Sequence, residues 1–157
     1  MKRVLIYGAI LASVAAVPVC PLKIGQMLPV KVVAIYKEGT RTVIETDTKN
    51  KGVGDTAVQA LCNMKDTASG IIYLDTAQYL LLTKDTEEAA EELREELRPG
   101  VRLCRTETAV DLEEAARYLD AHGKLPKLKA WEKGAELPLL GAVEDSFIFL
   151  KKVENNA

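Results

Sequence analysis

The sequence predicts an α+β domain, in which a mixed β-sheet carries helices packed mainly on one face. Three observations predict this class. Short apolar runs of strand-like composition recur along the chain, and two stretches of helical spacing each follow a capping box. The order of these segments is β-β-α-β-β-α-β-α-(α)-β. The predicted domain spans residues 20–157, and a separate N-terminal segment covers residues 1–19.

The first two strands are predicted as a hairpin within residues 28–50. Apolar residues occupy both alternating sets of positions over residues 30–35, so we expect the first strand to be covered on both faces. Residues 37–40 supply the turn, in which Gly39 is able to adopt a positive φ. Residues 42–47 mix polar and apolar types, which predicts a less buried return strand.

A loop that leads into a helix is predicted for residues 50–70. Asp55 or Thr56 can cap the helix. The helical stripe predicted to be buried comprises Ala57, Val58, Leu61 and Cys62. The run Gly52-Val53-Gly54-Asp55 is interpreted as a loop-to-helix turn. A phosphate-binding loop would need a third glycine or a Lys-Ser/Thr pair, which this run lacks.

The middle of the chain predicts two strands and a helix. Residues 71–74 and 79–83 are strand-like, and the second run is nearly all apolar, as expected of a central strand. A capping box from Asp85 to Glu88 opens a helix that continues through Leu97. The apolar positions of that helix are Ala89, Ala90, Leu93 and Leu97.

The last third predicts a strand within residues 101–108, a helix opened by a second capping box from Asp111 to Glu114, and a final strand within residues 145–153. Residues 124–144 are interrupted by prolines, with at most a short helix at 127–133. The helix after Asp111 has the clearest amphipathic pattern, formed by Leu112, Ala115, Ala116 and Leu119, and Gly123 is its expected C′ residue.

Residues 1–19 have the layout of a signal peptide or membrane anchor. Lys2 and Arg3 form a positive start, and no charge follows until Lys23. Three export interpretations stay open: cleavage after Ala15, lipid attachment at Cys20, or an uncleaved anchor. Each places the domain outside the cytoplasm, either at the outer face of the cell membrane or secreted. The alternative to export is that residues 2–13 form a buried first strand.

Few residues are candidates for chemistry. Net charge is −2 and no basic block with aromatics occurs, which argues against nucleic-acid binding. The three cysteines match no zinc pattern, and we expect neither a metal nor another cofactor. Cys62 and Cys104 are a candidate disulfide, the alternative for Cys62 being a small buried side chain. Trp131 is a candidate partner contact, its alternative being a half-buried core residue.

The ordered segments resemble the N-terminal domain of the spore germinant receptor C-subunit family, Ger(x)C. The resemblance lies in a leader ending near Cys20, then "VVAIYKEG", "GDTAVQAL" and "IIYLDTAQYLLLTKD", followed by two helices. Pro21-Leu22 replaces the family's Trp-Asp, Thr76 replaces its strand histidine, and family members are more than twice this length. The resemblance implies a membrane-attached, non-enzymatic component that works with integral membrane receptor subunits.

Three functional hypotheses follow. The first is a membrane-attached extracytoplasmic interaction domain similar to a germination receptor component. The second is a small secreted binding module of unrelated role. The third is an exported enzyme that uses Asp75, His122 or surface glutamates. Its catalytic residues would have to come together from distant segments, because no nucleophile motif is present.

Overall fold

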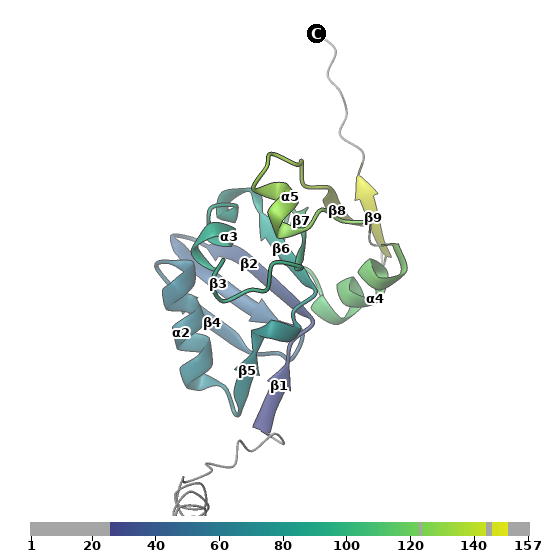
Figure 1. The fold of residues 1–157 in the computed structure, drawn as a ribbon. Helices are drawn as coiled ribbons and strands as arrows, with labels where there is room; N and C mark the ends of the chain where they lie inside the picture. Colours follow the sequence, from purple (N-terminus) through teal and green to yellow (C-terminus); the bar gives the residue numbers. More distant parts are fainter. Residues whose placement is uncertain (1–25, 123, 144–145, 151–157) are drawn as a thin grey trace, which may run out of the picture.

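The computed structural model describes residues 26–122, 124–143 and 146–150 (Figure 1). Within these ranges the chain forms nine strands and four α-helices, which confirms the predicted α+β class with a mixed sheet. The elements are β1 (Met27–Pro29), β2 (Val32–Glu38), β3 (Arg41–Thr46), β4 (Lys51–Gly54), α2 (Ala57–Thr67), β5 (Ile71–Tyr73), β6 (Tyr79–Thr83), α3 (Ala89–Glu92), β7 (Arg102–Thr106), α4 (Leu112–His122), α5 (Leu128–Trp131), β8 (Leu139–Val143) and β9 (Ser146–Leu150), with 3₁₀ turns at Leu74–Thr76 and Lys84–Thr86.

The main sheet has seven strands in the order β4-β3-β2-β6-β7-β8-β9. Strands β2, β6, β7 and β8 are parallel to one another, whereas β3, β4 and β9 pair antiparallel with their neighbours. The apolar run at β6 is the central strand, as predicted, and both of its faces are covered. Strands β1 and β5 form a separate parallel pair at one end of the molecule (Figure 1).

Helices cover both faces of the main sheet, three on one face and one on the other, which agrees with the prediction that one face carries most of them. Alternate residues of β2 show the division: Val33 and Ile35 belong to one apolar cluster, Val32 and Ala34 to the other. The first cluster receives the apolar residues of α2, α3 and α5. The second receives those of α4.

Several local predictions are confirmed. Gly39 has a φ of 64° in the β2–β3 turn. Thr56 caps α2, since its side chain accepts a hydrogen bond of 3.2 Å from the Gln59 N–H. Asp111 accepts one of 2.9 Å from the Glu114 N–H at the start of α4. All four apolar positions predicted for α4 are buried.

Other local predictions are wrong. The Gly52–Gly54 run is not a loop but part of β4, which pairs with β3. Strand β3 is therefore enclosed between β2 and β4, and its Thr42 and Thr46 are buried rather than exposed. On α2, Val58 and Cys62 face outward, because Ala60 and Met64 take the buried positions beside Ala57 and Leu61.

Two further corrections concern the later elements. The capping box after β6 is formed by Thr83 and Thr86, not by Asp85 and Glu88, and α3 spans only Ala89–Glu92. The apolar positions predicted there are nevertheless all buried. The proline-interrupted stretch contributes β8, a strand that the prediction lacks.

Gly123 and the N-terminal segment of residues 1–19 lie outside the described residues. Among the helices of the described ranges, none has the length and apolar character needed to cross a membrane.

Candidate functional site

Both described cysteines are free, so the interpretation of Cys62 and Cys104 as a disulfide is corrected. Cys62 is exposed on α2, which packs on one face of the main sheet. Cys104 is buried in the cluster on the opposite face. The sheet therefore lies between the two thiols. A disulfide would require the Cα atoms of Cys62 and Cys104 to be close together, which this arrangement prevents. The lipid-attachment candidate Cys20 lies outside the described residues.

We expect a thiol reagent at pH 8 to label Cys62 quickly and Cys104 at least about a thousandfold more slowly. Cys62 is exposed, whereas burial raises the pKa of the Cys104 thiol to about 12 and so suppresses the thiolate that reacts. Intact-mass and peptide mass spectrometry over time would measure both rates. Equal rates in the folded protein would contradict this placement. In urea, both cysteines should react at similar rates.

The other predicted side chains lie apart from one another. Trp131 in α5 is half-buried and packs against the α2–α3 face of the core, so part of its side chain belongs to the core. Asp75 is exposed in the 3₁₀ turn after β5. His122 is exposed at the end of α4, where its ring stacks on Tyr118 at a centroid distance of 4.5 Å. No hydrogen bond or ion pair joins Asp75 to His122 within the described ranges.

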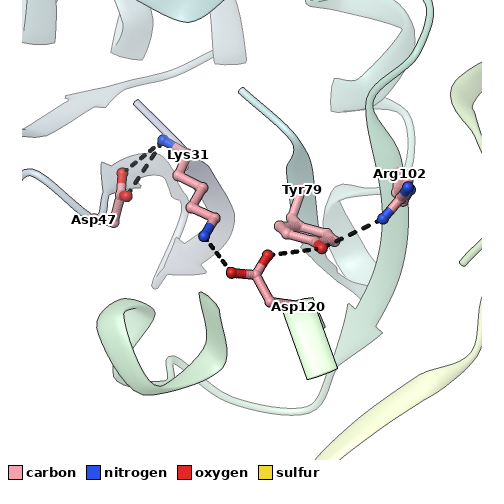
Figure 2. A network of polar contacts seen from close by, with 5 residues as sticks. All are labelled: Lys31, Asp47, Tyr79, Arg102 and Asp120. Carbon is pink, nitrogen blue, oxygen red and sulfur yellow. Dashed lines mark hydrogen bonds and ion pairs between the residues drawn. The ribbon is translucent and has the colours of Figure 1, made fainter. Parts of the chain in front are cut away.

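The most extensive polar network instead lies where the parallel strands begin (Figure 2). Lys31 directly precedes β2, while Tyr79 and Arg102 are the first residues of β6 and β7. The Lys31 ammonium pairs with Asp120 of α4. The Tyr79 hydroxyl donates to Asp120 Oδ1 at 3.1 Å and accepts from Arg102 Nη1 at 3.4 Å.

The backbone around Lys31 completes this network. Its N–H donates to the two carboxylate oxygens of Asp47 at 3.1 and 3.3 Å. Its carbonyl accepts from the N–H groups of Gln78 and Tyr79 at 2.8 and 3.1 Å. The network therefore joins β2, β6, β7 and α4 with the turn after β3.

The electrostatics of this network favour a structural role. Hydrogen bonding from Lys31 lowers the pKa of Asp120, and burial followed by the Asp120 hydrogen bond raises the pKa of Tyr79. A general acid or base works best with a pKa near the operating pH. Both shifts move these groups away from neutral pH, so the arrangement is suited to holding α4 against the sheet.

Sequence reasoning missed this network because its five residues come from separate segments. The available pattern was that Lys31 directly precedes an apolar strand and that Arg102 is the first residue of another strand. In a parallel sheet such residues meet at one edge. That inference requires β2, β6 and β7 to be recognised as parallel neighbours, which composition does not reveal.

A smaller polar group lies at the opposite ends of the parallel strands, where open α/β sheets usually bind ligands. The buried Thr86 hydroxyl donates to the Ile35 carbonyl at 2.9 Å, which ties the turn after β6 to β2. Arg105 at β7 pairs with Glu87, although its buried Nε has no hydrogen-bond partner among the described residues. These contacts join β2 and β7 to the turn after β6. Among the described residues they do not form a substrate site.

Within the described part of the chain, no group of three His, Cys, Asp or Glu side chains is placed to hold a metal ion. Comparison of the sequence with protein-family models, with curated proteins and with solved structures finds no match in any of the three. The resemblance to the germinant receptor C subunit therefore stays a proposal.

Proposed function

We propose that this chain is a non-enzymatic interaction domain held at the outer face of the cell membrane, as in the spore germinant receptor C subunit that it resembles. The observation that carries the proposal is the outward face of β5. Ile71 and Tyr73 are 48% and 39% exposed, whereas Ile72 between them is buried. A strand face turned to water normally carries polar side chains, so an apolar face favours contact with a partner.

The position of β5 relative to the predicted anchor supports the same function. Strand β5 pairs with β1, and β1 begins at Met27, seven residues after Cys20. Seven extended residues span at most about 25 Å. A chain anchored at Cys20 would thus hold Ile71 and Tyr73 close to the membrane, within reach of an integral membrane subunit.

The first test is the intact mass of the mature protein from membrane and medium fractions, measured beside a Cys20→Ala variant. We expect a membrane form that either begins at a lipidated Cys20 or keeps residues 1–19. In the lipidated case, Cys20→Ala should abolish the added diacylglycerol mass. A soluble form beginning near Ala16 would overturn the proposal in favour of the secreted binding module.

A second test concerns the partner surface. Replacing Ile71 and Tyr73 with serine should lower co-purification of an integral membrane protein by about tenfold, because buried apolar anchors dominate binding energy. Val58→Ser is the matched control, since Val58 is 45% exposed but lies on α2. Equal co-purification by the double variant and the control would count against this surface.

A further inference from the structure

The segment around α3 carries a stripe of negative charge on its outer side, which we call the acidic stripe. It consists of Glu88, Glu91 and Glu95, which are exposed and form no ion pair with another described residue. Helical backbone hydrogen bonds continue from Glu88 to Leu97, so the spacing of the three glutamates places them on one side. Arg98 follows them in the sequence. Like charges at this spacing repel one another.

A basic stripe lies next to the acidic stripe, on α5 and the turn that follows it (Figure 1). It consists of Lys129 and Lys133, which are exposed, one helical turn apart, and without an ion pair among the described residues. Trp131 packs against the first apolar cluster, so the two lysines lie on the outer side of the helix. Arg94 pairs with Glu132 at 3.2 Å, and this ion pair joins the α3 segment to α5.

Both stripes run along the direction of the parallel strands. The α3 segment leads from the end of β6 back to the start of β7, because these two strands are parallel. Helix α5 follows Lys127, which pairs with Arg102 at the start of β7, and leads to β8, which pairs with Arg105 further along β7. A surface with an acidic and a basic stripe side by side is complementary to a second copy of itself.

We propose that this surface binds the same surface of a second copy of the chain, about a twofold axis that runs between the two stripes and along them. The acidic stripe of each copy then faces the basic stripe of the other copy, and every contact occurs twice. Charges that repel one another within one copy are balanced across the interface. An axis perpendicular to the stripes would set like charges opposite each other, so the charges also specify the orientation of the two copies.

This orientation is compatible with anchoring of both copies in one membrane. Because the axis follows the strands, the ends at which β2, β6 and β7 begin lie on the same side of the dimer. Strand β1 leads into β2 and lies with β5 at that end (Figure 1). Both copies would therefore turn Ile71 and Tyr73 towards the same membrane. This last step rests on the proposed function, whereas the dimer itself does not.

Two charge-reversed variants of the full chain test this arrangement. The first carries Lys129→Glu and Lys133→Glu, so that both of its stripes are acidic. The second carries Glu91→Lys and Glu95→Lys, so that both of its stripes are mainly basic. We expect each variant alone to dimerise at least about tenfold more weakly than the unsubstituted chain. A one-to-one mixture of the two should form a mixed dimer, which also shows that both variants are folded.

Light scattering of the full chains in mild detergent would measure the mass of protein in each assembly. The unsubstituted chain should have the mass of two copies at low ionic strength and shift towards one copy as added salt screens the charges. The control carries Lys37→Glu and Arg117→Glu, which change the net charge equally but lie on β2 and on α4, away from both stripes. This control should dimerise as the unsubstituted chain does.

The proposal is wrong if the unsubstituted chain has the mass of one copy at low ionic strength. It is also wrong if the control loses as much affinity as the stripe variants, or if the two stripe variants do not associate when mixed. A chain that is secreted but dimerises in this way would support the dimer and overturn the membrane function, so the two failures are distinguishable.

Discussion

Gly52→Ala is expected to lower the free energy of unfolding by about 3 kcal/mol, the upper part of the usual range for overpacked sites. A Cβ atom at Gly52 would lie 2.0 Å from the Ala60 carbonyl oxygen, 2.6 Å from Met64 Cβ and 2.7 Å from the Met64 nitrogen. Two of these atoms belong to the backbone of α2. No side-chain rotation can relieve the contact, so the whole helix would have to move away from β4.

The consequence of that movement is loss of apolar packing. Ala60, Leu61 and Met64 are buried residues of α2 in the cluster between this helix and the sheet, and all three would lose contacts. Urea unfolding followed by Trp131 fluorescence would measure the change. Gly100→Ala is the matched control, because no atom lies within 4 Å of its Cβ position, and we expect a change below about 0.5 kcal/mol. Equal stability of the two variants would show that α2 does not pack as described.

The same glycines explain why the sequence predicted a loop at β4. Glycine is depleted in strands, so Gly52 and Gly54 in one short run favour a turn when they are considered locally. The tertiary structure explains why glycines occur at these two positions, since α2 approaches β4 too closely for a side chain at either one. A comparable limit applies to β8, because the prolines that precede it, Pro126 and Pro138, indicate a loop although β7 and β9 pair with this strand.

Features set by local periodicity were predictable. The buried stripe of α4 and the apolar run of β6 follow from residue spacing alone, because one face of a helix and both faces of a central strand must be covered. The polar network was not predictable, since Lys31 and Asp120 are 89 residues apart and meet only through the strand order. The β9 edge is intermediate, because its residues were predicted as a strand but its place at the border of the sheet was not.

Leu119→Ala is expected to lower the free energy of unfolding by about 2–5 kcal/mol, the range for deleting a fully buried leucine. Leu119 is completely buried in the cluster between α4 and the sheet. The cost combines lost burial of the side chain with the cavity that remains, because neighbouring strands cannot collapse onto it freely. Urea unfolding at pH 7 would measure the effect. A cost below 1 kcal/mol would show that this face of the helix is not packed.

A variant of the adjacent residue Asp120 distinguishes the polar contacts that hold α4 on the sheet from the apolar contacts made by Leu119. Asp120→Asn keeps the shape of the side chain but removes the charge paired with Lys31. Because the Asp120 side chain is 44% exposed, this ion pair contributes at most about 1 kcal/mol to the free energy of unfolding. Because Lys31 lowers the pKa of Asp120, this contribution is present above the ordinary aspartate pKa and is lost as pH falls through the lowered value. Wild type and Asp120→Asn should therefore differ at pH 7 and converge as the pH falls through the lowered pKa of Asp120, whereas Leu119→Ala should stay less stable than wild type throughout. A difference between wild type and Asp120→Asn that persists in acid would mean that the carboxylate acts through packing and not through its charge.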